Sequence, residues 1–203
     1  MFIEILLSLI IGYLLGSVPF ALVVGKVFYR KDVRNYGSRN LGGCNSGRVL
    51  GKKAGLAVMT LDLLKATVAI FLASGFENRE VTMVIAGLAA GLGHCYPIFA
   101  GFKGGKAVAA LYGFLFGMGV FTECSMWTFF LPLIVFMLIL YLSKIVSLSS
   151  ILGALSSSVY IIFSTDFKLL WIVSLILTLI VIVRHKGNIV RMIHKEERKI
   201  SWM

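Results

Sequence analysis

The sequence predicts an all-α integral membrane protein, built as one polytopic bundle of about seven transmembrane helices. Of its 203 residues, 59% are apolar and only 14% are charged, whereas an ordinary soluble domain carries about 25% charged residues. Apolar runs of about 17 to 22 residues recur along the whole chain, and a helix of that length crosses a bilayer. No internal repeat or low-complexity linker divides residues 1–203, so we expect a single membrane-embedded domain.

The first predicted span covers residues 2–25. It opens with Glu4 and has no basic residue ahead of its apolar run, so it lacks the positive region of a cleaved signal peptide, and we expect it to be retained. The other apolar runs, each bounded by polar residues, are 54–74, 81–100, 107–122, 125–142, 147–163 and 168–184. Asp62 and Lys65 lie one turn apart in the second span, which predicts an ion pair inside the bundle.

The basic residues fall on alternate loops. If the first span ends in the cytoplasm, the loops on that side are residues 26–53, 101–106, 143–146 and 185–203. Together with Arg184 at the membrane edge, these loops hold every lysine and arginine except Lys65, Arg79 and Lys168. Such a bias predicts an outer N-terminus and a cytoplasmic C-terminus. The net charge of +11 is therefore concentrated on one face, where it also favours contact with anionic lipid headgroups.

Residues 32–53 form the first of three polar segments on that face. The segment contains Gly37, Ser38, Asn40, Gly42, Gly43, Asn45, Ser46, Gly47, Arg48 and Gly51. Glycines let successive backbone amides turn toward an anion, and arginine presents a rigid fork that suits phosphate. The pattern favours a phosphate-binding loop, with a flexible basic loop as the alternative.

Residues 101–106 form the second polar segment. Gly101, Gly104, Gly105 and Lys106 lead directly into an apolar helix, and glycines followed by a helix N-terminus and a lysine favour phosphate binding. The segment is not a Walker A loop, because Ala100 and Ala107 replace two of its key residues and a membrane span precedes it. ATP is therefore not expected. His94, in the preceding span, is more typical of a structural hydrogen-bonding residue than of a catalyst.

Residues 183–197 form the third polar segment. His185 and Asn188 are three residues apart, so they share a helix face where the last span leaves the membrane. For residues 191–199, anchoring in the membrane interface is an alternative. Ser147, at the inner end of the sixth span, adds a hydroxyl group, although close helix packing explains a serine there equally well.

Together the three segments predict a site for phosphorylated ligands at the cytoplasmic surface. Cys44, Cys95 and Cys124 lack the spacing of a disulfide framework or a metal site, and no paired carboxylates or Ser-His-Asp set is evident. We therefore expect no metal, no cofactor and no nucleic acid. The residues alone leave open whether the site transports its ligand or transforms it.

Several of these segments, in the same order, resemble the bacterial acyl-phosphate-dependent glycerol-3-phosphate acyltransferases of phospholipid synthesis. The family's opening span is similar to YLLGSVPFALVVGK, its first motif to YGSRNLGGCNSGRVLGKKAG, its second to GHCYPIFAGFKGGKAVA, and its third region to SLSS and RHKGNIVRMIHKEE. The resemblance covers nearly the whole chain. It implies a seven-span enzyme of the bacterial cytoplasmic membrane whose site faces the cytoplasm.

The resemblance implies transfer of a fatty acyl group from acyl phosphate to the sn-1 hydroxyl of glycerol 3-phosphate, giving lysophosphatidic acid and phosphate. These substrates and membrane lipids are then the expected partners. The catalytic residues it implies are Ser38, Arg48, Lys106, His185 and Asn188. The substrate-binding residues it implies are Asn40, Gly42, Gly43, Asn45, Gly101, Gly104, Gly105, Ser147 and Glu197.

Four residues depart from the family pattern. Arg39, Ala107 and Lys195 stand where the family has glycine, and Cys44 stands where it has threonine. The departures leave a diverged relative open, with a different acyl donor or acceptor or with lost activity. A membrane transporter or binding protein for a phosphorylated solute is the other alternative. It is disfavoured because the polar motifs share one face and no inverted repeat is evident.

Overall fold

The computed structural model describes residues 1–200 and contains no β-strand in this range. Its elements are α1 (Phe2–Gly16), α2 (Phe20–Tyr29), η1 (Val33–Asn35), α3 (Gly43–Leu50), α4 (Lys52–Ala73), α5 (Arg79–Cys95), η2 (Ile98–Ala100), α6 (Val108–Phe121), α7 (Trp127–Ser143), α8 (Val146–Ser164), α9 (Lys168–Arg184) and α10 (Lys186–Ile193). The all-α prediction is confirmed.

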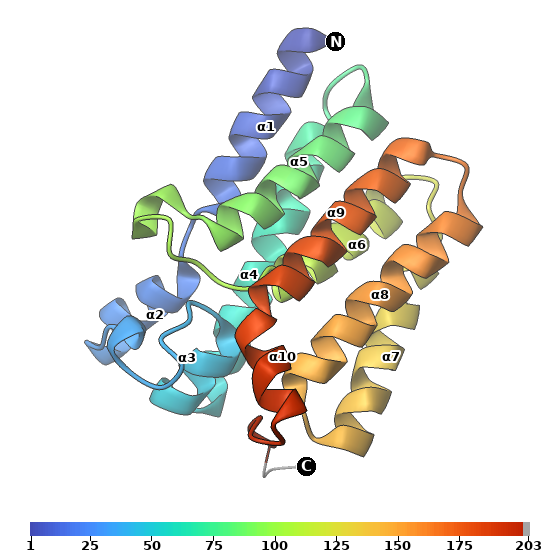
Figure 1. Ribbon diagram of the computed structural model, residues 1–203. Coiled ribbons are helices and arrows are strands. Elements are labelled where there is room, and N and C mark those ends of the chain that lie inside the picture. Colours follow the sequence, from blue (N-terminus) through green and yellow to red (C-terminus); the bar gives the residue numbers. More distant parts are fainter. Residues whose placement is uncertain (201–203) are drawn as a thin grey trace.

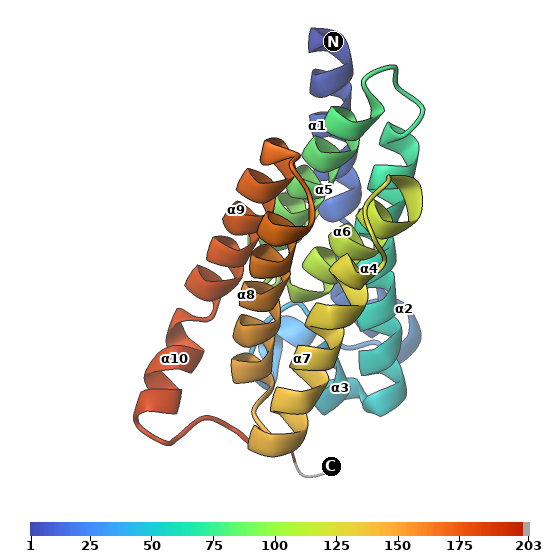
Figure 2. The same cartoon turned by 90° about the vertical axis from the view of Figure 1, so that its right-hand side faces the viewer.

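The long helices lie side by side, and the short ones gather at one end of the bundle (Figure 1). Helix α1 packs against α5, α4 against α6, and α7 against α8. The N-terminus lies at the opposite end from α2, α3 and α10, as the perpendicular view also shows (Figure 2). We call the end formed by α2, α3 and α10 the site end, and the other end the N-terminal end.

Four helical segments are long and apolar enough to cross a membrane, namely Phe2–Tyr29, Lys52–Ala73, Arg79–Ala100 and Val146–Ser164. Helices α9 and α10 add a fifth if they form one span, with a bend of 57° between them. Helices α6 and α7 are apolar but have only 14 and 17 residues. A helix of about 14 residues rises about 21 Å, less than the hydrocarbon core of about 30 Å. Length and composition therefore support four or five spans within the described residues.

The first predicted span, residues 2–25, is not one continuous helix. Residues 17–19 separate α1 from α2. Pro19 has no N–H to donate, and proline disfavours helical backbone at the preceding residue, here Val18. The break leaves the Val18 carbonyl available inside the bundle, where it accepts a hydrogen bond from Lys65 Nζ at 2.9 Å.

Lys65 and Asp62 form the ion pair that the sequence predicts. Lys65 Nζ lies 2.7 Å from Asp62 Oδ1, and both side chains are buried. The Nδ1 atom of His94 lies 3.5 Å from the same carboxylate oxygen. Pairing offsets the cost of removing both charges from water, and the cluster links α4 to α5 and to the break between α1 and α2.

Helices α1 and α5 approach closely through small residues. Gly12 and Gly16 of α1 face Ala86 and Ala90 of α5, and a Cβ atom at Gly16 would lie 2.6 Å from the Ala90 Cα. Small residues let helix backbones approach one another in membrane bundles. Glycine at these two positions is therefore explained by this helix contact.

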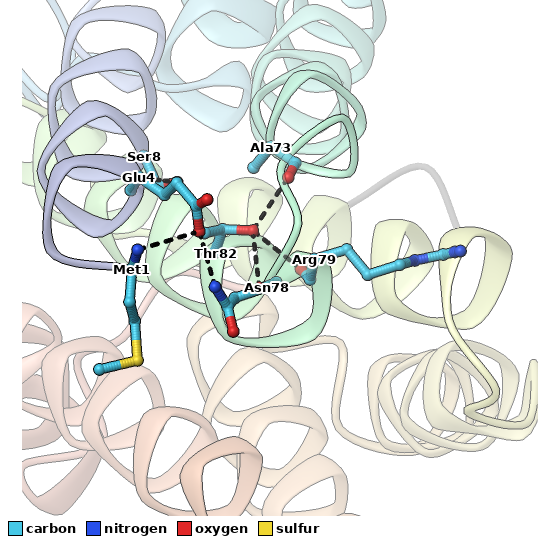
Figure 3. Close-up of polar contacts among 7 residues, drawn as sticks. All are labelled: Met1, Glu4, Ser8, Ala73, Asn78, Arg79 and Thr82. Atoms are coloured by element: carbon cyan, nitrogen blue, oxygen red, sulfur yellow. Dashed lines mark hydrogen bonds and ion pairs between the residues drawn. The ribbon is translucent and has the colours of Figure 1, made fainter.

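Polar contacts tie α1 to the turn between α4 and α5 at the N-terminal end (Figure 3). Asn78 Nδ2 donates a hydrogen bond to Glu4 Oε2 at 2.8 Å. Thr82 Oγ1 donates to the Ala73 carbonyl at 2.9 Å. These contacts hold the ends of α1, α4 and α5 together at the opposite end of the bundle from α3 and α10.

Candidate active site

The three polar segments predicted from the sequence lie toward the site end (Figures 1 and 2). The first segment contributes α3 and the loop before it, and the second contributes residues 101–107 between α5 and α6. The third contributes the junction between α9 and α10 and the tail after α10. The start of α8 joins them through Ser147, which is buried.

Four of the predicted site residues form one hydrogen-bonded network. Lys106 Nζ donates to Asn188 Oδ1. Asn188 Nδ2 donates to Glu197 Oε1 at 2.5 Å, and Ser147 Oγ donates to the same oxygen at 2.9 Å. Side chains from the second polar segment, from α10, from the tail and from the start of α8 are therefore in direct contact.

Arg191 completes this network, and it was not among the predicted site residues. Its Nε donates to Glu197 Oε2 at 2.8 Å. Burial alone would raise the pKa of Glu197, but hydrogen bonds from Asn188, Ser147 and Arg191, and the charge of Arg191, lower it below its usual value. Glu197 is therefore an ionised carboxylate that accepts hydrogen bonds from three side chains. The spacing of three residues from Asn188 to Arg191 places them on one helix face, which is a signal that sequence reasoning could have used.

Lys106 is a partly buried cation whose pKa is lowered to about 8. Burial is the main cause, and the charges of Arg191 and Arg48 lower the pKa further, while Glu197 raises it. The amine therefore remains mainly protonated at pH 7 and lies within electrostatic reach of Arg48 on α3. A partly buried lysine beside an exposed arginine forms a favourable environment for a phosphate group.

His185 lies buried at the junction of α9 and α10. Its Nδ1 is 2.8 Å from the Val181 carbonyl oxygen, and because a carbonyl only accepts, the neutral ring carries its proton on Nδ1 and a lone pair on Nε2. Burial and the charge of Lys106 lower the pKa of His185 to about 4. The ring is therefore neutral at pH 7, with Nε2 as a hydrogen-bond acceptor.

Asn45 holds the loop that carries Ser38. The Asn45 side chain is buried, and its Oδ1 accepts a hydrogen bond from the Ser38 N–H at 2.8 Å. Its Nδ2 donates to the carbonyls of Val33 and Tyr36, at 3.0 and 3.3 Å. The Asn45 side chain therefore makes its hydrogen bonds to the main chain of this loop and not to a ligand. The Ser38 residue remains exposed at the surface of the loop.

The remaining residues of the first segment lie on or next to α3. Gly42 caps the helix N-terminus, and Asn40, which is partly buried, lies close to it. Gly43 is buried in the contact with α4, since a Cβ atom there would lie 2.8 Å from the Gly55 carbonyl oxygen. Arg48 is exposed near the C-terminal end of α3. Gly43 thus allows α3 to pack closely against α4, whereas the exposed Arg48 side chain is not held in a helix contact.

The glycines of the second segment bring the chain close against the end of α5. The Gly104 N–H donates to the Cys95 carbonyl at 3.1 Å, and the Gly105 N–H donates to the His94 carbonyl at 2.9 Å. These two amides therefore bind the protein itself and do not point to a ligand. Gly101, with φ of +63°, lies exposed at the preceding turn.

Arg184 fixes the same loop from the other side and was also missed as a site residue. Its Nε donates to the Gly105 carbonyl and its second amine, Nη2, donates to the Gly104 carbonyl, both at 3.0 Å. Its guanidinium lies over the Tyr96 ring at 5.4 Å. The position of Lys106 therefore depends on a loop held by hydrogen bonds to both α5 and α9.

Three of the departures from the family pattern share one backbone property. Arg39, Ala107 and Lys195 have φ values of +60°, +61° and +60°. Glycine adopts this left-handed conformation without steric cost, which explains why glycine is expected at each position. The fourth departure, Cys44, is exposed on α3.

An apolar helical bundle with cations, hydroxyl groups and a neutral imidazole near one end is the arrangement expected of an integral membrane enzyme for anionic substrates. The comparisons identify its family. Residues 6–195 match the model of the family described as glycerol-3-phosphate acyltransferase. The chain belongs to this family.

Relatives match the chain over all or nearly all of its length. A glycerol-3-phosphate acyltransferase of Listeria monocytogenes serotype 4a (strain HCC23) is 44% identical over 205 residues, which cover 100% of both chains. One of Geobacillus kaustophilus (strain HTA426) is 45% identical over 197 residues, which cover 97% of this chain and 96% of the relative.

Solved structures agree. The crystal structure of PlsY (YgiH), an integral membrane glycerol 3-phosphate acyltransferase, is similar in its glycerol 3-phosphate form with a TM-score of 0.89 and 33% identity, over 97% of this chain and 96% of that one. Its lysophosphatidic acid form gives a TM-score of 0.86 and 32% identity, over 97% and 95% of the two chains. The predicted family and the predicted acyltransferase class of enzyme are confirmed.

Proposed function

We propose that the chain transfers a fatty acyl group from acyl phosphate to the sn-1 hydroxyl of glycerol 3-phosphate. The hydroxyl oxygen attacks the acyl carbonyl carbon, the bond from that carbon to the phosphate oxygen breaks, and lysophosphatidic acid and inorganic phosphate result. The observation that carries the proposal is the network of Lys106, Asn188, Glu197 and Ser147, with Arg48 and His185 close enough to interact electrostatically with Lys106.

Acyl phosphate suits this site because it is a mixed anhydride and is already activated. The enzyme then has to hold two phosphorylated reactants in attack geometry and to stabilise the negative charge that develops. Cationic side chains can do both. In this proposal Arg48 binds the phosphate of glycerol 3-phosphate, and Lys106 binds a substrate phosphate beside the reacting carbonyl.

His185 and Asn188 position the attacking hydroxyl. The Nε2 atom of the neutral imidazole is suited to accept a hydrogen bond from the hydroxyl, and either this nitrogen or a substrate phosphate oxygen takes the proton. Ser147 and Glu197 act together, because the serine donates to the carboxylate that orients Asn188. Ser38, in the loop held by Asn45, supplies a hydroxyl donor to substrate.

The backbone of the glycine segments shapes the pocket. Gly104 and Gly105 allow residues 101–107 to lie against α5, and this sets the point at which Lys106 leaves the main chain. Gly101 supplies the turn before it. In the first segment, Asn40, Gly42 and Gly43 are proposed to shape the substrate pocket beside Arg48.

We further propose seven spans, with α6 and α7 included, in a single domain of the bacterial cytoplasmic membrane. The N-terminus lies outside, and the site end faces the cytoplasm. The charge distribution supports this orientation, since residues 26–53, 101–107 and 184–199 carry most of the basic residues and such residues favour the cytoplasmic side.

A diverged relative with another donor or acceptor is the principal rival. The backbone argues against it at three positions, because Arg39, Ala107 and Lys195 occupy the left-handed conformation that suits the expected glycines. None of these substitutions removes a side chain from the Lys106 network. Cys44 is the departure that lacks such an explanation, and Cys44→Thr tests whether the threonine hydroxyl raises activity.

The proposal is tested with the purified full-length chain, acyl phosphate and glycerol 3-phosphate. Lysophosphatidic acid and phosphate are expected in equal amounts, and Arg48→Ala and Lys106→Ala are each expected to lower kcat/KM on the order of 100-fold or more. Lys103→Ala is the matched control, because it removes an exposed lysine from the same loop and is expected to retain activity.

Robust turnover by both Arg48→Ala and Lys106→Ala would refute the assigned site. Uptake of labelled glycerol 3-phosphate into vesicles without consumption of acyl phosphate would indicate transport in place of acyl transfer. Complementation of a strain that lacks its own acyl-phosphate acyltransferase checks the reaction in cells.

A further inference from the structure

A buried cluster of ionisable side chains lies under the site loops and has no role in the chemistry proposed above. Asp62 and Lys65 come from α4, and His94 comes from the end of α5. Each of the three residues is at most 6% exposed. The His94 Nδ1 atom faces the Asp62 carboxylate at 3.5 Å and has no hydrogen-bond partner within the described residues.

The other edge of the His94 ring lies against Gly105. A Cβ atom at Gly105 would meet His94 Nε2 first, and it would lie 2.8 Å from His94 Cε1. The His94 carbonyl also accepts the hydrogen bond from the Gly105 N–H at 2.9 Å. His94 therefore contacts Gly105 through both its ring and its main chain, one residue before Lys106.

Gly105 is also the point where the first and second polar segments touch. A Cβ atom there would lie 2.7 Å from the carbonyl oxygen of Leu41, which belongs to the loop before α3. A cavity of about 10 Å³ beneath this contact is lined in part by Leu41, Asp62, His94 and Gly104. Such a space holds at most one water molecule. The imidazole therefore has little room to turn without moving both loops.

We propose that Asp62 and His94 are positioning residues for Lys106. Asp62, whose charge is balanced by Lys65, orients the imidazole, and the imidazole fixes Gly105 and thereby the direction from which Lys106 reaches Asn188. This inference rests on the proposed function, because it assigns Asp62 and His94 to the same site. Neither residue touches substrate.

The test compares His94→Leu and His94→Gln with Thr82→Val in the full-length protein. Thr82 is a fully buried polar residue near the other end of the same helix, so its variant reports general destabilisation of α5. A misplacement of about 1 Å can cost on the order of 100-fold in rate. We therefore expect His94→Leu to lower kcat/KM on the order of 100-fold, in part through a higher KM for a phosphorylated substrate.

His94→Gln keeps a polar group near the Nε2 position and is expected to recover part of the loss, which a residue that only fills space would not show. If His94→Leu does not fold, the kcat and KM of His94→Gln are compared with those of Thr82→Val instead. Thr82→Val is expected to lower the unfolding temperature and to leave kcat and KM of the folded protein unchanged.

Wild-type kcat and KM in His94→Leu, or a loss that only follows the unfolded fraction as in Thr82→Val, would overturn the positioning role. These outcomes differ from failure of the proposed function. A wild-type chain that forms no lysophosphatidic acid refutes the function itself, whereas an active wild type with an equally active His94→Leu refutes only this inference.

Discussion

At neutral pH Lys106 is protonated and His185 is neutral, and each protonation state suits the proposed role of the residue. Burial lowers the pKa of Lys106 to about 8 and that of His185 to about 4. Between these values Lys106 is a cation able to bind phosphate, and His185 is a neutral acceptor for the attacking hydroxyl. The charge of Lys106 contributes to the low pKa of His185 and so helps to keep the ring neutral.

Activity is therefore predicted to decline on both sides of this window. As pH rises through about 8, Lys106 loses its proton and substrate phosphate binds more weakly. As pH falls toward about 4, His185 gains a proton and loses its acceptor. The measurement is kcat/KM against pH for the wild type and for Lys106→Arg, whose guanidinium stays charged. An active Lys106→Arg variant should lose the alkaline decline and keep the acid one. An unchanged alkaline decline would show that another group causes it.

At the scale of single elements, the loop that leads into α6 carries backbone strain at Ala107. This residue has φ of +61° at the helix N-cap, a conformation that costs a non-glycine residue about 1 to 2 kcal/mol. Glycine avoids this cost but loses more chain entropy on folding. Ala107 is also fully buried, so Ala107→Gly removes a methyl group from the core at a cost of about 0.8 kcal/mol. Relief of strain offsets these costs, and the variant is predicted to change the stability by less than about 1 kcal/mol.

The apparent unfolding temperature in detergent checks this prediction. Ala109→Gly is the matched control, because Ala109 lies inside α6, where glycine costs about 1 kcal/mol relative to alanine. Ala109→Gly should therefore lower the temperature more than Ala107→Gly does. A larger decrease in Ala107→Gly than in Ala109→Gly would show that Ala107 is not strained.

The helices were predictable because long apolar runs mark them, and most predicted ends lie within two residues of the observed ones, as for α9. Two predicted spans, 2–25 and 81–100, are interrupted where the sequence analysis expected one helix. Residues 2–25 break at Pro19, and α5 ends at Cys95 shortly before Pro97. Hydropathy extends smoothly across both prolines, whereas the missing N–H and the restricted preceding residue end the helices. The predicted span 168–184 does end where α9 ends, because a polar segment follows it, but hydropathy does not indicate the bend of 57° between α9 and α10.

The site was predictable where a polar side chain lies just outside an apolar span, as Lys106 does before α6 and Asn188 does after α9. The sequence could not indicate that Gly104 donates its N–H to the protein itself, because that depends on tertiary hydrogen bonds. Arg184 looked like a charge at a membrane edge, yet it binds the glycine loop. His94 looked structural because the sequence does not indicate that its ring lies against Gly105.

At the scale of the whole molecule, the two ends of the bundle differ in character. The N-terminal end joins helix ends through contacts such as that between Glu4 and Asn78 (Figure 3), whereas the site end gathers the partly buried network of Lys106, Asn188, Glu197 and Ser147. In the proposed orientation the site end lies where membrane and water meet. An enzyme that joins a water-soluble phosphoester to a fatty acyl group needs access to both. The net charge of +11 attracts anionic substrates to it.

The central claim is that three separate segments meet at one membrane face, toward the cytoplasm. The most direct test places single cysteines at Arg39, Lys103 and Lys186, each exposed in one segment, in a chain without its native cysteines. Glu77, in the turn at the N-terminal end, provides the opposite reference. In intact cells a membrane-impermeant thiol reagent should label Glu77→Cys only, and the other three variants should react only after permeabilisation. Labelling of Arg39→Cys, Lys103→Cys and Lys186→Cys from different sides of the bilayer would contradict the claim.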